Sequence, residues 1–197
     1  MTRIYLLRHG QTQFNQKERI QGSCDSKLTV KGVKQAKDVK TYLDKINFAA
    51  VFCSTSERTL DTVTYATGGR YPITPCKAFK EIDFGDLEGD DESKQFAGLE
   101  TKNFQFLLLN EGWSAVNGET GFSMTKRVFA KLDEIVAKYP NENILIACHG
   151  GTIMNIVMNI DHDLIKSSIP GPENCSITII DYHGKYRLID YNLNVSN

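Results

Sequence analysis

Residues 4–10 read Ile-Tyr-Leu-Leu-Arg-His-Gly, and residues 144–151 read Ile-Leu-Ile-Ala-Cys-His-Gly-Gly. In each stretch an apolar run typical of a buried β-strand ends directly in a histidine that is followed by glycine. Ligands bind at the carboxyl ends of strands in open α/β sheets, and glycine lets the backbone approach a substrate closely. Either histidine alone is more simply read as a hydrogen-bonded loop residue. The repeated arrangement predicts that His9 and His149 share one pocket.

Two arginines are placed to bring positive charge to this pocket. Arg8 directly precedes His9. Arg58 lies in the opening turn of a predicted helix, just after the candidate capping residues at 54–56. Guanidinium groups and helix N-termini both favour a tetrahedral oxyanion. A single arginine is more often a solvated surface group, but two arginines together with two histidines predict a phosphate site.

Hydrolysis of a phosphate ester needs a nucleophile, positive charge around the equatorial oxygens and a proton for the leaving alkoxide. Neutral imidazole can be that nucleophile without a metal ion, because histidine forms covalent intermediates near neutral pH. Carboxyl groups for proton donation are present in the stretch 81–89, Glu-Ile-Asp-Phe-Gly-Asp-Leu-Glu-Gly. The local pattern does not choose among Glu81, Asp83 and Glu88, since acidic loops are often simply solvated.

Short apolar runs alternate with helical patterns along the chain, which is typical of parallel strands joined by crossover helices. We therefore expect an α/β fold, a three-layer α/β/α sandwich with a mostly parallel central sheet. Strands are predicted at 4–7, 50–53, near 73 and at 143–148, with an edge hairpin formed by 176–182 and 186–191. Helices are predicted after Thr29, from about Ser56, over 92–109, over 124–139 and over 152–158.

The length of 197 residues corresponds to roughly 1.3 average domains, so we expect a single domain over 1–197 with a helical lid insertion at about 84–122. The 23 basic and 24 acidic residues give a net charge of −1, which disfavours nucleic acid or an anionic membrane as the main partner. The apolar runs are too short for a membrane span or a secretory signal. The five cysteines are scattered and form no CxxC pair, so a reduced, cytoplasmic protein is expected.

The stretch Leu6-Leu7-Arg8-His9-Gly10-Gln11-Thr12, with Asn15, closely resembles the histidine phosphatase superfamily, also called the phosphoglycerate mutase-like family. The resemblance spans nearly the whole chain, and its first motif in a strand context is highly specific. Further pieces follow in the order of the family, at 28–36, at Ser54, Arg58 and Thr62, at 81–89, at Gly118-Glu119, at 149–151 and at 174–176.

The resemblance implies a role for each matching residue. His9 is expected to attack phosphorus and to become phosphohistidine, while Arg8, Arg58 and His149 hold the phosphoryl oxygens. The resemblance, rather than local spacing, selects Glu81 as the proton donor to the leaving oxygen. The residues expected to assist substrate binding are Asn15 and Gly150. No metal and no cofactor are implied.

The sequence departs from the family pattern in two places. The stretch 55–59 lacks the proline and leucine that are common before the family arginine, and Leu87 stands where many members carry tryptophan. These departures leave the approach of Arg58 and the floor of the pocket less defined. Arg58 is retained because its distance from Ser54 and its order in the chain both fit.

The same acidic stretch bears on the choice between hydrolysis and phosphate transfer. From Glu81 to Glu92 there are seven carboxylates and no lysine or arginine, whereas a mutase must hold a second phosphate with additional cations. We therefore predict a phosphomonoester hydrolase for a small phosphorylated metabolite, with a cofactor-dependent phosphoglycerate mutase as the alternative. A non-catalytic phosphate-binding regulatory module and a metal-dependent hydrolase that uses His9, His149, Glu81 and Asp83 are competing hypotheses from different functional classes. The sequence leaves open whether the chain forms a homodimer.

Aromatic residues of the insertion allow two interpretations. Phe96, Phe104 and Trp113 either pack on the leaving group of the substrate or fill the core of the insertion itself, and the second is the simpler expectation. Negative potential in the same region is expected to oppose polyanionic substrates.

Overall fold

The computed structural model describes residues 1–166 and 169–195, and six strands of this part of the chain form one sheet. The order across the sheet is β3-β2-β4-β1-β5-β6. The first four strands in this order pair in parallel, and β5 and β6 form an antiparallel hairpin at the edge. The predicted α/β fold with a mostly parallel sheet and an edge hairpin is therefore confirmed. The strands are β1 (Thr2–Arg8), β2 (Ala50–Cys53), β3 (Ile73–Pro75), β4 (Asn143–Cys148), β5 (Ile177–Tyr182) and β6 (Tyr186–Leu193).

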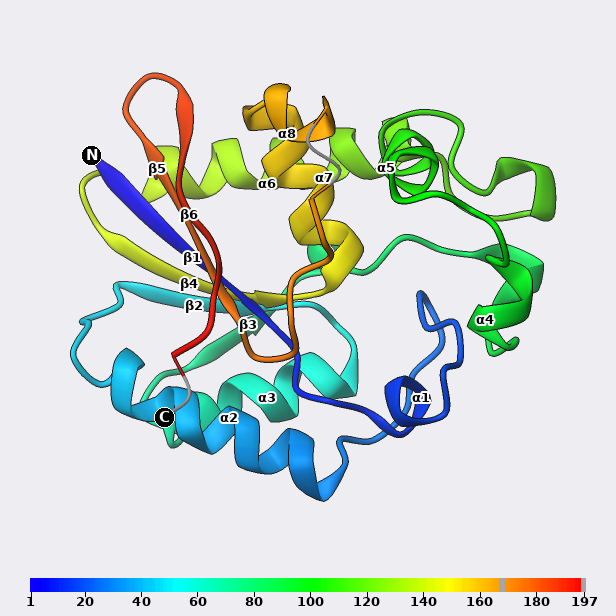
Figure 1. Ribbon diagram of the computed structural model, residues 1–197. Helices are drawn as coiled ribbons and strands as arrows, with labels where there is room; N and C mark the ends of the chain where they lie inside the picture. Colours follow the sequence, from blue (N-terminus) through cyan, green and yellow to red (C-terminus); the bar gives the residue numbers. More distant parts are fainter. Residues whose placement is uncertain (167–168, 196–197) are drawn as a thin grey trace.

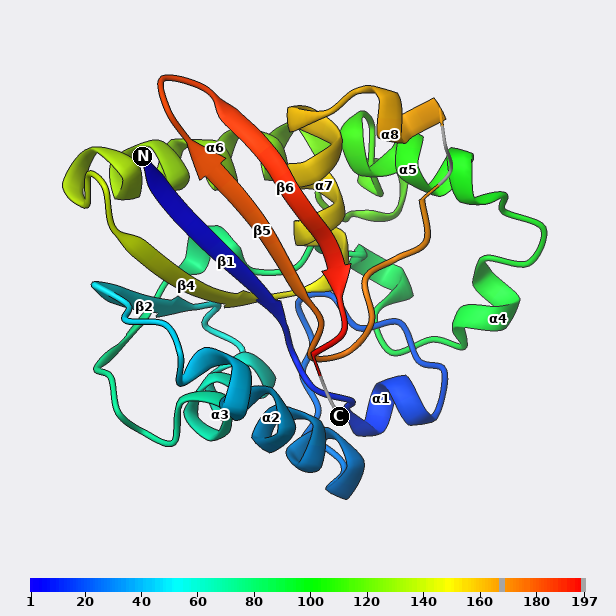
Figure 2. The ribbon, with the colours of Figure 1, turned by 60° about the vertical axis from the view of Figure 1, so that its left-hand side comes forward.

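The helices cover both faces of this sheet. Figure 1 and Figure 2 show α2 and α3 on one face and α6 and α7 on the other, and each pair encloses its own apolar core. Within the described residues, no helix has the length and apolar character needed to cross a membrane. The helices are α1 (Gln13–Gln16), α2 (Val30–Leu43), α3 (Glu57–Thr67), α4 (Glu92–Gln95), α5 (Thr101–Leu109), α6 (Gly121–Lys138), α7 (Gly150–Ile160) and α8 (Asp163–Lys166). Three short 3-10 turns are η1 (Lys77–Phe79), η2 (Gly85–Leu87) and η3 (Ser114–Val116).

The longer helices follow directly from capping and apolar spacing. Thr29 accepts a hydrogen bond from the Gly32 amide at 3.0 Å and starts α2, whose buried face includes Ala36, Val39 and Leu43. Helix α6 starts in the same way at Thr120 and buries the predicted stripe from Met124 to Val136. These two predicted helices are confirmed.

The prediction of one helix over 92–109 is wrong. The chain forms α4 and α5 instead, separated by the turn at 96–100. Gly98 within this turn has φ of +74°, a left-handed conformation that interrupts a right-handed helix. Helix α4 itself has no apolar residue, whereas Phe96 of the turn and Phe104 and Leu107 of α5 pack against one core, so their spacing resembled that of a single helix.

The register between β1 and β4 sets up the functional edge of the sheet. Leu7 lies opposite Ala147, and Arg8 lies opposite Cys148. The residues that follow these two strands must therefore emerge side by side. In Figure 2, α1 and α4 lie beyond this same edge, so segments distant in sequence surround the strand ends.

Candidate active site

The two histidines predicted to share a pocket lie together at the carboxyl ends of β1 and β4. The ring centroids of His9 and His149 are 5.3 Å apart, and the rings meet edge to face. Both residues are buried, with exposed fractions of 4% and 0%. The strand register described above is what brings them together, because each histidine directly follows one residue of the paired Arg8 and Cys148.

The hydrogen bond of His9 determines which ring nitrogen is free. Its Nδ1 lies 2.9 Å from the carbonyl oxygen of Gly10, and since a carbonyl can only accept, Nδ1 carries the proton. Burial, together with the Arg58 and Arg8 cations, lowers the pKa of His9 well below its usual 6.5. The imidazole is therefore neutral at pH 7, and its Nε2 keeps a lone pair that can act as a nucleophile.

His149 has the opposite tautomer. The Nε–H of Arg58 donates to His149 Nδ1 at 3.2 Å, so the proton of the neutral ring lies on Nε2. Burial and the Arg58 cation lower the pKa of His149 well below 6.5. Its Nε2 is buried and has no hydrogen-bond partner among the described residues. A buried donor without a partner is costly, and an oxyanion beside His9 would satisfy it.

Arg58 acts from behind His149 and is not among the residues that line the cavity. It is completely buried in the first turn of α3. Besides its bond to His149, its guanidinium donates to the carbonyls of Cys24 and Gly22 and to the Asp25 carboxylate. The structure thus places Arg58 beside His149 although its flanking sequence lacks the family's proline. The neighbouring N-cap residue, Ser56, makes no side-chain capping hydrogen bond.

Arg8 brings a second, partly buried cation close to His9. Its Nη1 donates to the carbonyl of Pro172, whereas its Nε is buried without a partner among the described residues. Burial lowers the pKa of Arg8, yet a guanidinium stays protonated at neutral pH. A Cβ built on Gly150 would lie 3.4 Å from Arg8 Cζ, so this glycine borders the guanidinium closely.

Glu81 reaches the site from irregular backbone between η1 and η2. One carboxylate oxygen accepts from the Gly151 amide at 2.8 Å. The other accepts from the Thr152 hydroxyl at 3.2 Å and from the Ile82 amide at 3.1 Å. A Cβ on Gly151 would lie only 2.8 Å from Glu81 Oε1. A side chain at 151 would therefore displace this carboxylate from its place at the N-terminus of α7.

The structure also separates the three acidic candidates. Glu81 lines the same cavity as His9, whereas Asp83 does not. The Asp83 carboxylate accepts a hydrogen bond from the Gly85 amide, and Glu88 accepts four backbone N–H groups that hold the loop at 22–24 and Phe84. Glu88 is thus part of the scaffold.

Asn15 presents its amide to the cavity from α1. Its Oδ1 accepts from the Thr12 amide at 3.1 Å and from Asn174 Nδ2 at 3.4 Å. Because both bonds use the oxygen, the side-chain NH2 group remains available to a ligand. Asn174 also donates to the carbonyl of His9 at 3.0 Å, which ties the two neighbouring loops together.

Arg8, His9, Asn15 and Glu81 line a cavity of about 220 Å³, whereas His149 and Arg58 are not among its lining residues. Arg19 and Glu92 line it and were not predicted from the sequence, since neither belongs to a motif. Phe96 and Phe104 line it as well, while Trp113 packs behind them with 5% exposure. The lining is Arg8, His9, Asn15, Arg19, Ile20, Gln21, Glu81, Phe84, Glu92, Phe96, Phe104, Gly150, Gly151, Met154, Gly171 and Pro172.

The aromatic residues fill the core of the insertion, which is the simpler of the two expectations, and some of them also border the cavity. The ring centroids of Phe104 and Trp113 are 5.5 Å apart and those of Phe84 and Trp113 are 4.6 Å apart, so the rings form a packed cluster. Phe84, Phe96 and Phe104 of this cluster also border the cavity. Among residues 1–166 and 169–195, no three His, Cys, Asp or Glu side chains gather in a group that could hold a metal ion.

Among the described residues, Arg8 and His149 each keep a buried N–H group without a partner, and the ring of His9 adjoins that of His149. These features define an α/β protein with a site suited to a small oxyanion near an imidazole. The family model described as the histidine phosphatase superfamily (branch 1) matches residues 4–194. The chain belongs to this superfamily.

The relatives include proteins named for both hydrolysis and phosphate transfer. The chain is 28% identical to the uncharacterized phosphatase PhoE of Bacillus subtilis, over 98% of this chain and 96% of the relative. It is 29% identical to the probable phosphoglycerate mutase GpmB of Salmonella paratyphi A, over 92% and 86%. The crystal structure of a phosphoglycerate mutase from Bacillus anthracis superposes with a TM-score of 0.86 at 27% identity, covering 98% of this chain and 93% of the other. The fold prediction is confirmed by this similarity.

Proposed function

We propose that the chain is a phosphomonoester hydrolase that acts on a small phosphorylated metabolite through a phosphohistidine at His9. The observation that carries the proposal is the pair of opposite tautomers. His9 has a free Nε2 lone pair, and His149 beside it has an unpartnered Nε2–H among the described residues. A nucleophile next to a preorganised donor is the arrangement that transfer of a phosphoryl group requires.

In the first step, Nε2 of His9 attacks phosphorus and the bond from phosphorus to the leaving oxygen breaks. Glu81 in its acid form gives its proton to that oxygen, so the product leaves as an alcohol. In the second step, water attacks phosphorus, and the Glu81 carboxylate takes a proton from this water. The bond from nitrogen to phosphorus then breaks and returns its electron pair to His9.

The phosphoryl oxygens carry negative charge in both steps. Arg8 and His149 offer donors that have no partner within residues 1–166 and 169–195, and Asn15 and the Gly150 amide are further donors at the rim. Arg58 contributes its buried positive charge and orients His149 through Nδ1. Neither histidine is charged in the resting site, so the arginines are the principal source of electrostatic stabilisation.

Phosphoglycerate mutase activity is the alternative, supported by the names of several relatives. A mutase must retain a second phosphate while the first group is passed on. The cations that line the cavity are Arg8 and Arg19, and they are matched there by the carboxylates of Glu81 and Glu92. This balance favours hydrolysis. Conversion of 3-phosphoglycerate to 2-phosphoglycerate in the presence of 2,3-bisphosphoglycerate would decide for the mutase.

The test compares wild type with His9→Ala on a chromogenic phosphate monoester in the presence of EDTA. His183→Ala is the matched control, because this exposed histidine lies in the turn between β5 and β6. Wild type and the control should turn over the ester and yield an acid-labile phosphoenzyme after rapid quenching, and His9→Ala should do neither. Equal turnover by His9→Ala would exclude His9 as the nucleophile.

The same experiment separates hydrolysis at His9 from metal-dependent hydrolysis and from simple phosphate binding. A metal-dependent hydrolase would lose activity with EDTA, and a non-catalytic phosphate-binding module would bind phosphate without turnover. A small phosphorylated substrate, no nucleic acid or membrane as partner, and a cytoplasmic location remain predictions of this proposal, and it leaves open whether the chain forms a homodimer.

A further inference from the structure

Arg127 of α6 uses every N–H group of its guanidinium on one short segment of chain and one carboxylate. Its Nη1 donates to the carbonyls of Ala78 and Lys80 at 2.7 and 2.8 Å. Its Nη2 donates to the carbonyl of Glu81 at 3.2 Å. Nε and Nη2 also donate to the two carboxylate oxygens of Glu119, both at 2.7 Å. A guanidinium has five such donors, so none is left over.

Most of the segment that Arg127 holds lies outside the helices and strands. Residues 80–84 connect η1 to η2 and lie outside the strands, so their carbonyls are not paired in the sheet. Buried backbone carbonyls need partners, and here a side chain supplies them. The hydroxyl of Thr152 adds a second bond to the Lys80 carbonyl at 3.1 Å.

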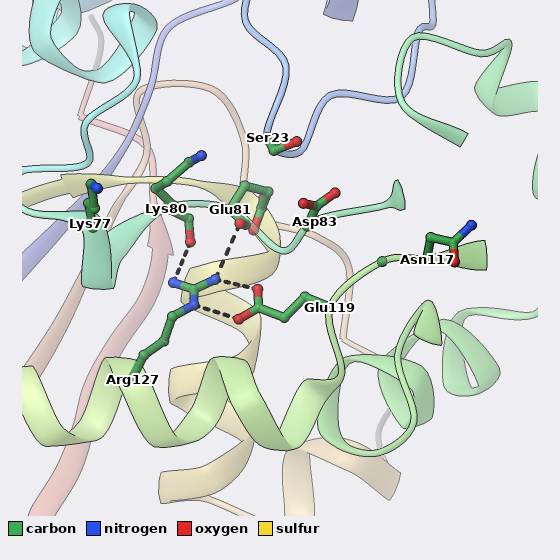
Figure 3. A pocket seen from close by; sticks show the side chains of 9 residues that line it. Ser23, Lys77, Lys80, Glu81, Asp83, Asn117, Glu119 and Arg127 are labelled. Carbon is green, nitrogen blue, oxygen red and sulfur yellow. Dashed lines mark hydrogen bonds and ion pairs between the residues drawn. The ribbon is translucent and has the colours of Figure 1, made fainter. Parts of the chain in front are cut away.

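Glu119 fixes the chain on the other side of Glu81. Its backbone amide donates to the carbonyl of Asp83 at 2.8 Å, while its carboxylate holds Arg127. Arg127 and Glu119 together therefore fix the backbone just before Glu81 and just after it. Figure 3 shows the Arg127 guanidinium beneath this segment, with Glu119 beside it.

The pair lies outside the catalytic cavity. Arg127 and Glu119 line a second cavity of about 350 Å³, which also borders Glu81, Lys77 and Lys80. Both side chains are partly accessible there, with exposed fractions of 23% and 16%. Neither residue is among those that line the cavity with His9.

We infer that Arg127 and Glu119 form a positioning pair, which holds the Glu81 carboxyl at the leaving oxygen through the backbone of residues 78–83. The inference rests on the proposed function, because it assigns a purpose to the placement of the proton donor. The pair does not touch the substrate. Its loss should impair proton transfer while the nucleophile His9 and the phosphate-binding donors of Arg8 and His149 stay in place.

The kinetic test uses Arg127→Ala and Arg127→Lys, with Arg3→Ala as the matched control. Arg3 forms a comparable two-bond pair with Asp181, at 2.7 and 2.8 Å, and neither partner lines the two cavities described above. Arg127→Ala should lower turnover of an alkyl phosphate about 100-fold. Phosphoenzyme formation from nitrophenyl phosphate should fall much less, because nitrophenolate leaves without a proton. Inhibition by inorganic phosphate should stay within about 2-fold.

The second cavity permits a rescue experiment. Truncation of Arg127 to alanine leaves a space that opens into this cavity, so added guanidinium ion can enter and restore bonds to the carbonyls. Guanidinium at millimolar concentration should recover part of the alkyl phosphate turnover of Arg127→Ala. It should not recover the turnover of Glu81→Gln. Arg127→Lys, which keeps the charge without the fork, should fall between Arg127→Ala and wild type.

Equal losses with both esters, accompanied by weaker phosphate inhibition, would assign Arg127 a general structural role and overturn the inference. A measurement that does not depend on turnover is the amide proton shift of Gly151, which reports the hydrogen bond to Glu81. This resonance should move upfield in Arg127→Ala and stay unchanged in Arg3→Ala. An unchanged Gly151 resonance in Arg127→Ala would refute the positioning pair, whereas an inactive wild type would refute the proposed function alone.

Discussion

A methyl group at position 151 is a small change that displaces Glu81 without altering a polar group. The Cβ of alanine there would lie 2.8 Å from Glu81 Oε1 and 3.1 Å from its carboxyl carbon. An ordinary contact begins near 3.4 Å, so the carboxylate must move by about 0.6 Å. Misplacement by 1 Å costs up to about 100-fold in rate, and Gly151→Ala is therefore expected to lose about 10-fold to 100-fold.

This loss corresponds to about 1.4 to 2.7 kcal/mol in activation free energy. It should be largest for alkyl phosphates, since their leaving oxygens need the proton most. Global stability should change little, because alanine is the better helix former in α7 and offsets part of the local strain. The assay is steady-state turnover of an alkyl phosphate beside burst kinetics with nitrophenyl phosphate, with unfolding in urea as the check on stability.

Gly150→Ala is the matched control for this prediction. The same methyl group one residue earlier would meet Arg8 Cζ at 3.4 Å, which is an ordinary contact. Gly150→Ala should therefore keep the dependence of rate on the leaving group that wild type has. The reasoning is refuted if the two alanine variants lose alkyl phosphate turnover equally, or if Gly151→Ala weakens phosphate binding by as much as it slows turnover.

Three further predictions concern charge and scaffold. The pKa values of His9 and His149 in the folded chain lie below the unfolded value of about 6.5, so protons bind the unfolded chain first as the pH falls. The free energy of unfolding should therefore decrease below pH 6.5, by up to about 1.4 kcal/mol per pH unit for each histidine. Alanine variants should flatten this pH dependence in urea unfolding. Glu88→Gln weakens hydrogen bonds to four backbone N–H groups and should lower the free energy of unfolding in urea by about 1.5 to 3 kcal/mol. Glu134→Gln changes an exposed residue and should alter the same free energy by less than about 0.5 kcal/mol. Arg58→Met removes a cation that lowers the pKa of His9. The pH below which the rate of phosphoenzyme formation falls, measured by rapid quench, should therefore rise. An unchanged pH profile would contradict the effect of Arg58 on the pKa of His9.

The parts of the fold that the sequence predicted are those governed by local pattern. Apolar runs located β1 and β4, and their common ending in histidine and glycine placed both rings at one edge. The prediction of one helix over 92–109 was wrong because the chain adopts a left-handed conformation at Gly98. A single glycine inside an apolar pattern is compatible with a continuous helix, so only the folded chain distinguishes the two.

The site was predictable where a motif carried it and not where tertiary structure alone did. His9, Arg8, His149 and Glu81 are brought together as expected. Arg58 contacts His149 and the loop at 22–25 and does not line the cavity, which its spacing could not reveal. Arg19 and Glu92 had no motif to mark them, whereas Gly151 belongs to the His-Gly-Gly stretch at 149–151, although its contact with Glu81 was not predicted. The pair Gly150-Gly151 after His149 was the available signal for the contact with Glu81, because two successive glycines at the start of a helix indicate close approach by another group.

The proposed catalytic groups depend on two different kinds of support. His9 and His149 follow paired strands, so the backbone hydrogen bonds of the sheet hold them and single side-chain changes nearby leave their separation intact. Glu81 lies on irregular backbone, and its position depends on side chains from α6 and α7 that are distant in sequence. Substitutions at those distant positions should therefore alter proton transfer selectively, while substitutions around the histidines should alter nucleophilic attack and proton transfer together. The dependence of rate on leaving group is the measurement that separates these two classes, since it changes only when the proton donor moves relative to a phosphoryl group that stays in place.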